Sequence, residues 1–218
     1  MVAPHADDEV LGCAGTLLRR RSEGVEIGWL LMTEVSEAHG WSMGKIKMRK
    51  QEITQVRNLL GISPEYLFEL ELEASSLDQV PMTELIGRVS DIFNRFYPDE
   101  VLIPHSGDIH SDHRVCFDAV AACTKWFRYP FVQRVLAYET LSETDFGLRQ
   151  QDVFVPNYYL DISNFFEQKV LLANIYKTEF ANHPFPRSQT SIRALAEIRG
   201  AQSGFHFAEA FQLLRERS

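Results

Sequence analysis

The sequence has 218 residues, of which 45% are hydrophobic and 24% are charged, and its formal net charge is −8 at pH 7. The negative charge argues against nucleic acid or an acidic membrane surface as a partner. No apolar run approaches the ~20 residues that a membrane span needs. The length and composition predict a single globular domain over residues 1–218, with added strands and helices from about residue 131.

The three cysteines are too few for a disulfide framework, which favours a reducing, cytoplasmic location. We expect all three to pack as small buried residues. The N-terminus lacks the basic-then-apolar pattern of a signal peptide. A first strand usually has about 5 residues, so it stays open whether the native chain starts upstream of Met1. The sequence also leaves open whether the protein forms a homo-oligomer.

The hydrophobic pattern predicts alternating strands and helices up to residue 127. We expect strands at 1–3, 25–33, 66–70 and 100–104, and helices at 9–22, 45–60, 83–96 and 115–127. The polar segment 34–44 is expected to be a loop. Strands that alternate with helices are typical of a mostly parallel sheet with right-handed crossovers.

Beyond residue 130 the pattern is looser. We expect strands at 134–138, 157–161 and 211–214, helices at 165–180 and 192–198, and a proline-flanked loop near residue 185. The predicted fold class is therefore α/β. We expect a Rossmann-like, mostly parallel sheet with helices on both faces and an active site at the carboxyl ends of the strands.

Two polar clusters follow two of the predicted strands. The first includes His5, Asp7 and Asp8, and the second, at 105–114, contains three histidines and two aspartates. Clusters after neighbouring parallel strands converge at one edge of the sheet. Catalytic zinc takes three ligands of the His, Asp or Glu type and keeps an open position. His5, Asp8 and one of His110 or His113 would meet that requirement.

The two clusters resemble motifs of the LmbE-like (PIG-L) family of zinc-dependent N-deacetylases. Residues 4–9 resemble its P-H-P-D-D-E signature and residues 110–114 its H-P-D-H-R signature. Residues 48–52 resemble its R-x-x-E helix and residues 208–211 its A-E-A-F segment. Ala6 and Ser111 stand where the family usually has proline, so both turns lose some rigidity. The resemblance covers nearly the whole chain.

The resemblance implies an enzyme that removes acetyl from an N-acetylglucosamine-type sugar or glycoconjugate. It implies His5, Asp8 and His113 as metal ligands, Asp7 as the general base and His110 as the group that stabilises the oxyanion. Zinc is the expected metal, although nitrogen and oxygen ligands also admit iron(II) or cobalt(II). The chemistry agrees, because zinc lowers the pKa of bound water toward ~7 and a nearby carboxylate can take its proton.

Asp112 lies two residues after His110, and we expect its carboxylate to orient the imidazole and keep it cationic. Arg49 is open to two interpretations. The basic segment around it favours a solvated surface side chain, whereas the family resemblance implies a substrate contact through its planar guanidinium. Glu52, three residues further along the helix, would either orient Arg49 or simply pair with it on the surface.

Four further residues are candidates for substrate binding. His39 and Trp41 lie in the predicted loop, and the Trp41 ring would either stack on a sugar or pack against the following helix. Residues 182–188 resemble a segment of family members that act on chitobiose-type sugars, so His183 and Arg187 would line the substrate mouth or form a structural loop.

Two alternatives to the amino-sugar deacetylase remain. The same site would serve an amidase that acts on a thiol-sugar or another acyl-amine conjugate. A non-catalytic sugar-binding module with a vestigial metal site is the alternative from another class. A nucleotide-binding dehydrogenase is disfavoured, because no G-x-G-x-x-G follows the first strand.

Overall fold

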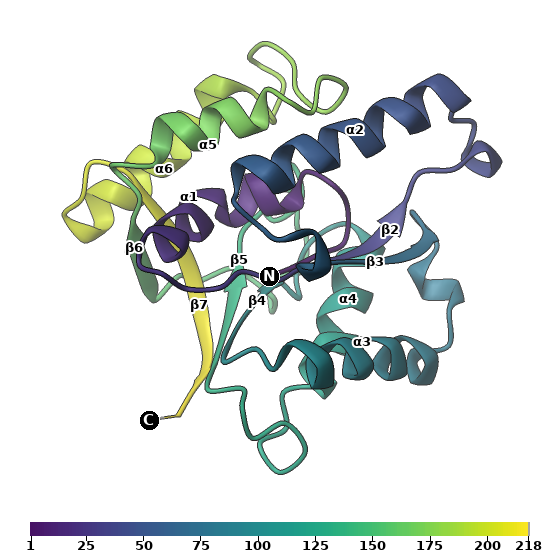
Figure 1. Cartoon of the computed structure of the whole chain (residues 1–218). Coiled ribbons are helices and arrows are strands. Elements are labelled where there is room, and N and C mark those ends of the chain that lie inside the picture. The colour runs from purple at the N-terminus through teal and green to yellow at the C-terminus, as the bar shows by residue number, and fades with distance from the viewer. Residues whose placement is uncertain (218) are drawn as a thin grey trace.

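The computed structural model describes residues 1–217. Its strands and helices alternate along the first half of the chain, as predicted (Figure 1). They are, in chain order, β1 (Val2–Ala3), α1 (Asp8–Ser22), β2 (Trp29–Glu34), α2 (Met43–Leu59), β3 (Leu67–Glu73), α3 (Met82–Phe96), β4 (Glu100–Pro104) and α4 (Ser111–Ala122).

The second half adds three strands and two helices. These are β5 (Arg134–Tyr138), β6 (Tyr158–Asp161), α5 (Phe166–Ala173), α6 (Gln189–Ser203) and β7 (Ala208–Glu216). Three short 3₁₀ turns lie in the first half of the chain, at Glu37–His39, Pro64–Tyr66 and Leu77–Gln79. No helix in residues 1–217 has the length and apolar character that crossing a bilayer requires.

The strands form two sheets that meet at β1 and β4. The first sheet has the order β1-β2-β3 and is parallel, and the second has the order β4-β5-β7-β6. β4 and β5 are parallel, whereas β7 runs antiparallel to β5 and β6. Since β1 contacts β4, the first five strands follow the order 3-2-1-4-5. The crossovers diverge between β1 and β4, which is the position where α/β sheets bind ligands.

Helices cover both faces of the sheets, as the fold class predicted. Figure 1 shows α1, α2, α5 and α6 on one side and α3 and α4 on the other. Each side has its own buried cluster. Along β2, Trp29 and Leu31 face the first cluster while Leu30 and Met32 face the second. A strand that is buried on both faces therefore needs a continuous apolar sequence.

Small residues let α1 approach the sheet closely. A β-carbon at Gly12 would lie 2.3 Å from Cδ2 of Tyr138, and one at Gly15 would lie 2.8 Å from Ile162. The two glycines therefore mark the surface on which α1 packs, and this packing places the N-terminal end of α1 at the carboxyl edge of the sheet.

Three helices differ from their predicted bounds for local reasons. The helix predicted at 192–198 spans Gln189–Ser203, because the Ser188 side chain caps it by accepting from the backbone N–H of Ser191 and Gly204 ends it. The helix predicted at 115–127 begins earlier, because the His110 side chain caps it by accepting a hydrogen bond from the backbone N–H of Asp112. It also ends earlier, where the Thr124 hydroxyl bonds the Ala121 carbonyl. The helix predicted at 165–180 ends at Ala173, after which the chain turns and buries Tyr176.

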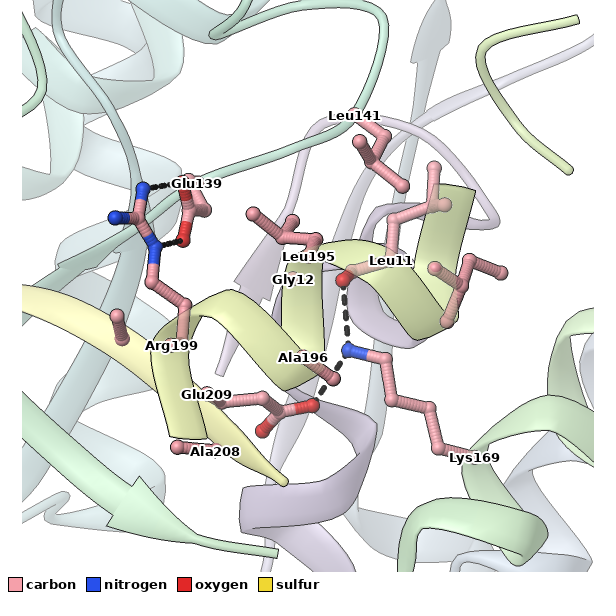
Figure 2. A pocket seen from close by; sticks show the side chains of 12 residues that line it. Leu11, Gly12, Glu139, Leu141, Lys169, Leu195, Ala196, Arg199, Ala208 and Glu209 are labelled. Atoms are coloured by element: carbon pink, nitrogen blue, oxygen red, sulfur yellow. Dashed lines mark hydrogen bonds and ion pairs between the residues drawn. The ribbon is translucent and has the colours of Figure 1, made fainter. Parts of the chain in front are cut away.

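A break inside α1 is held by a buried ion pair. Cys13 has non-helical dihedrals, with φ −150° and ψ 16°. Lys169 Nζ donates to the Leu11 carbonyl (2.8 Å) and to Glu209 Oε1 (2.6 Å), as Figure 2 shows. The carboxylate of Glu209 also accepts from the backbone N–H groups of Gly15 and Thr16. The pair thus satisfies backbone groups that the break leaves without helical partners.

Replacing Lys169 by methionine is expected to lower the free energy of unfolding by about 3–5 kcal/mol, because it leaves the Glu209 carboxylate buried without its counter-ion. Urea denaturation of the metal-free protein measures this. Lys50→Met is the matched control, since Lys50 makes an exposed ion pair with Glu34 (3.4 Å) and should change stability by less than about 1 kcal/mol. Equal effects of the two variants would contradict a stabilising role for the buried pair.

Candidate metal centre and active site

Three side chains from the two sequence clusters meet above β1 and β4. His5 follows β1, Asp8 is the first residue of α1, and His113 lies in the first turn of α4. Asp8 Oδ2 is 3.4 Å from His5 Nδ1 and 3.3 Å from His113 Nε2. Asp8 and His113 are buried, and His5 is partly exposed. The tertiary structure therefore brings together the three residues that the sequence proposed as metal ligands.

The donor set fits a divalent cation such as zinc. One nitrogen or oxygen from each of His5, Asp8 and His113 lies within 4.8 Å of the others. His113 Nε2 is buried and makes no hydrogen bond, although a carboxylate lies close by. A cation between these atoms would satisfy that nitrogen, and two imidazoles with one carboxylate form a donor set that zinc accepts.

Buried carboxylates hold the remote nitrogen of each ligand imidazole. Asp112 Oδ2 lies 3.0 Å from His5 Nε2, and Asp108 Oδ2 lies 2.8 Å from His113 Nδ1. The Asp112 carboxylate is itself fixed by the backbone N–H groups of Ser75 (2.6 Å) and Leu77 (3.1 Å). Such carboxylates orient an imidazole and keep the proton on the nitrogen that does not face the metal.

A second group, formed by His5, His110 and Asp112, has the same spacing but is less suited to a cation. His5 Nε2 and Asp112 Oδ2 are already hydrogen-bonded to one another. The Asp112 carboxylate also accepts hydrogen bonds from two backbone N–H groups. We therefore assign the cation site to the group that contains the unsatisfied His113 nitrogen.

The protonation that the sequence analysis expected for His110 is wrong. The backbone N–H of Asp112 donates to His110 Nδ1 (3.1 Å), so this nitrogen carries a lone pair and not a proton. Burial, followed by the nearby His5, lowers the pKa of His110 to about 4. The Asp112 carboxylate orients His5 instead. His110 is therefore neutral, with its proton on Nε2.

Neighbouring charges shift the pKa values of all three candidate ligands. Burial opposes the charge of His5, but the carboxylates of Asp112 and Asp8 outweigh it and raise the pKa of His5 to about 9. Burial is likewise outweighed at His113, where Asp8 and Asp108 raise the pKa well above its usual value. In the same way, His113 outweighs burial and lowers the pKa of Asp8. Two cationic imidazoles thus stand where a metal cation would replace their positive charge.

Asp7 occupies a strained backbone position between β1 and α1. Its φ of 141° lies in a region that residues with a β-carbon rarely adopt. The backbone N–H of Asp7 donates to Glu9 Oε2 (3.1 Å), and Glu9 Oε1 accepts from the Tyr176 hydroxyl (2.6 Å). Burial is the main cause that raises the pKa of Glu9 to about 8. These buried hydrogen bonds hold the turn that carries Asp7, directly before the candidate ligand Asp8.

The pKa of the Asp7 carboxyl is raised toward neutral pH. Burial and then the neighbouring Asp8 raise the pKa of Asp7 to about 7, while Arg187 acts in the opposite direction. Arg187 Nη1 lies 3.4 Å from Asp7 Oδ2, and Arg187 Nη2 lies 3.5 Å from Glu179 Oε2. A carboxyl whose pKa is near the working pH can both accept and return a proton.

Arg49 is buried, so the interpretation as a solvated surface arginine is wrong. Its guanidinium donates to the Ala6 carbonyl (2.9 Å), to Glu52 Oε2 (3.0 Å) and to the Thr178 hydroxyl (3.0 Å), and it also pairs with Glu179. The expected orientation by Glu52 is confirmed. Arg49 therefore ties the first motif to the segment around residue 178. It also lines a small pocket beside His5, so a substrate contact stays a prediction.

The other predicted substrate residues are more scattered. His39 is exposed and its Nδ1 pairs with the carboxylate of Glu73. The Trp41 ring lies under Arg49 (5.6 Å) and Lys45 (5.9 Å) of α2, which matches the helix-packing alternative. His183 lies in an exposed loop. Of these four candidates, Arg187 is the one that contacts the predicted base within residues 1–217.

Two residues of the site were not predicted from the sequence. Asp108 belongs to the second cluster, but nothing in the sequence distinguished it from Asp112 as the partner of a particular histidine. Glu179, which holds both arginines, lies far from either motif and carried no signal. The three cysteines are buried and free, as predicted.

The strand order and the site define the class of protein. It is an α/β protein with a mostly parallel sheet and a His–Asp–His group that could bind a cation at the switch point, next along the chain to a buried carboxyl of near-neutral pKa. The family model described as PIG-L, GlcNAc-PI de-N-acetylase, matches residues 1–124. The chain belongs to the PIG-L family, as its motifs predicted.

Similar proteins include deacetylases of known name. The chain is 22% identical to diacetylchitobiose deacetylase of Thermococcus kodakarensis, over 98% of this chain and 81% of that protein. A structure of N,N'-diacetylchitobiose deacetylase from Pyrococcus horikoshii has a TM-score of 0.76 and 20% identity, and covers 98% of this chain and 82% of that one. A conserved protein from Thermus thermophilus has a TM-score of 0.78 and 25% identity, and covers 100% of this chain and 94% of that one.

Proposed function

We propose that this protein is a metal-dependent N-deacetylase that hydrolyses the acetamide of an N-acetylglucosamine-type sugar or glycoconjugate and releases acetate. The observation that carries the proposal is the buried, unsatisfied His113 Nε2 beside Asp8, with Asp7 as the adjacent residue of the chain. Membership of the PIG-L family and the similarity to diacetylchitobiose deacetylase support the reaction and the class of sugar.

His5, Asp8 and His113 would hold the metal, with zinc as the expected ion. When bound, zinc supplies a Lewis acid that activates water at neutral pH and polarises the amide carbonyl. Asp108 and Asp112 keep the two imidazoles in the orientation and tautomer that binding requires. The ligand set leaves room for water and substrate, since three protein ligands are typical of catalytic rather than structural sites.

Asp7 would act as the general base and then as the general acid. It accepts a proton from the attacking water and returns it to the nitrogen of the leaving amine, so the carboxyl ends the cycle as it began. Arg187 balances the charge of the carboxylate form at 3.4 Å. The strained backbone lies at the residue directly before Asp8, and Asp7 itself is not in the candidate ligand group.

His110 would stabilise the negative charge that develops on the amide oxygen. Its neutral ring has Nδ1 occupied by the backbone N–H of Asp112, so the N–H at Nε2 is the free donor. A fixed, neutral donor in a buried site can lower the barrier by several kcal/mol, of the order seen when oxyanion-hole donors are removed. This role needs no positive charge on the imidazole.

Arg187 and the pocket beside His5 are the parts of the proposed site that would meet the sugar. Arg187 is partly exposed and lies over the ring of Phe185 (5.6 Å), at the edge of the exposed loop. The pocket lies between α2 and the ends of β2 and β3, and its wall includes Arg49 and Thr33. Arg187 and the side chains of this pocket could recognise the hydroxyl groups of a sugar through hydrogen bonds.

The proposed function predicts release of acetate from N-acetylated amino sugars by the zinc-loaded protein. Mass spectrometry of a panel that contains N-acetylglucosamine, diacetylchitobiose and bulkier acyl-amine conjugates measures the loss of the acyl group. Turnover confined to the bulky conjugates would favour the amidase alternative. Binding of these sugars with no turnover under zinc, iron(II) or cobalt(II) would favour a sugar-binding module and contradict the proposal.

A further inference from the structure

The carboxylate of Asp108 has a different partner on each oxygen. Oδ2 lies 2.8 Å from His113 Nδ1, and Oδ1 accepts a hydrogen bond from the Thr144 hydroxyl at 2.6 Å. Asp108 is only 1% exposed, so water does not compete for either oxygen. The proposed metal ligand His113 is therefore connected through Asp108 to Thr144, a residue 31 positions further along the chain in the loop after β5.

The direction of each hydrogen bond in this connection is determined. The Thr140 backbone N–H donates to the Thr144 hydroxyl oxygen at 2.8 Å, and an ionised carboxylate can only accept, so the hydroxyl hydrogen is directed at Asp108. The Thr144 backbone N–H in turn donates to the Thr140 carbonyl at 2.9 Å. Two bonds to one residue fix the position of the Thr144 side chain.

The loop that carries Thr144 is attached to the second motif at other points as well. The backbone N–H of Ile109 donates to the Glu143 carbonyl at 3.1 Å, and His105 Nε2 lies 2.7 Å from the Asp152 carbonyl. A β-carbon at Gly147 would lie 2.8 Å from the carbonyl oxygen of Gly107, so the two backbones approach closely there. These contacts hold the loop in place, so that the Thr144 side chain lies against Asp108.

We propose that Thr144 is a positioning residue of the metal centre, acting on His113 through Asp108. Its hydroxyl holds one oxygen of Asp108 so that the other accepts the proton of His113 Nδ1 and the lone pair of Nε2 faces the cation. Without that hydroxyl, a buried carboxylate oxygen loses its partner and the carboxylate can rotate away from the imidazole. The inference rests on the metal site of the proposed function, but it concerns metal affinity and not the reaction.

Three variants in one loop test this assignment. Thr144→Val has nearly the same shape without the hydroxyl, Thr144→Ser restores it, and Ser142→Ala removes a hydroxyl that bonds Glu143 (3.2 Å) and not Asp108. The dissociation constant for zinc is measured by competition with a fluorescent chelator. We expect Thr144→Val to weaken zinc binding about 10-fold, and Thr144→Ser and Ser142→Ala to bind zinc as the unmodified protein does.

Thermal melting of the zinc-free variants separates positioning from simple loss of folding. A Thr144→Val protein that melts normally without zinc and yet binds zinc weakly supports the assignment. Unchanged zinc affinity of Thr144→Val overturns it, and so does a Thr144→Ser protein that binds as weakly as the valine variant. If the unmodified protein binds zinc but hydrolyses no acetamide, the proposed function fails while the assignment of Thr144 stands.

Discussion

Replacing Asp7 by asparagine is expected to lower kcat by at least ~10²-fold, and up to ~10⁴-fold, the range that general acid–base catalysis contributes. The amide cannot accept the proton of water, whereas the neighbouring ligands His5, Asp8 and His113 are left intact. The zinc content of the variant, measured by atomic emission, is therefore expected to equal that of the unmodified protein. The measurement is the rate of acetate release at saturating substrate.

Asp91→Asn is the matched control, because Asp91 is an exposed residue of α3 on the opposite face of the sheet from α1. Its rate should equal that of the unmodified protein. Near-normal turnover by Asp7→Asn would show that another group takes the proton. Loss of zinc together with activity would instead indicate that Asp7 supports the metal site.

Replacing His113 by alanine is expected to abolish zinc binding and activity together. The imidazole supplies the unsatisfied Nε2 and stands between two buried carboxylates, Asp8 at 3.3 Å and Asp108 at 2.8 Å. Its removal therefore also leaves the buried Asp108 without its cationic partner and Asp8 with His5 alone, at a cost of about 3–5 kcal/mol in the free energy of unfolding. Equilibrium dialysis with zinc and urea denaturation of the zinc-free protein measure the two effects.

His206→Ala is the control for this prediction, since His206 is exposed in the turn before β7. It should bind about one zinc per chain, as a site with a single set of three ligands would. A His113→Ala protein that still binds zinc with normal affinity would contradict the ligand assignment, and the second His–Asp group would then be the site to test.

The elements of the fold were largely predictable because each depends on a local pattern. The strand Arg134–Tyr138 was predicted with its observed bounds. Helices α1 and α3 each begin one residue before their predicted N-terminus. Two of the larger errors occurred where a side chain ended a helix by hydrogen-bonding the backbone or by entering the core, as Thr124 and Tyr176 do. Such events depend on residues that a hydrophobic pattern does not distinguish.

The candidate metal ligands were also predictable, because both motifs follow strands and the carboxyl ends of parallel strands meet. The partners of those ligands were not. Asp112 was assigned to His110, its near neighbour in sequence, yet it holds His5, which lies 107 positions away. Arg49 stands in a basic segment typical of a surface, yet it is buried and paired with Glu179, 130 positions away.

The sequence by itself determined the alternation of strands and helices and the candidate groups for binding a metal and moving a proton. Both follow from residue type and spacing along one segment of chain. Only the tertiary structure decided which carboxylate holds which imidazole, that the backbone donates to His110 Nδ1, and that Asp108 connects His113 to Thr144. These are contacts and electric fields between packed side chains, and a buried hydrogen bond depends on distances of a few tenths of an ångström that the spacing of residues does not specify.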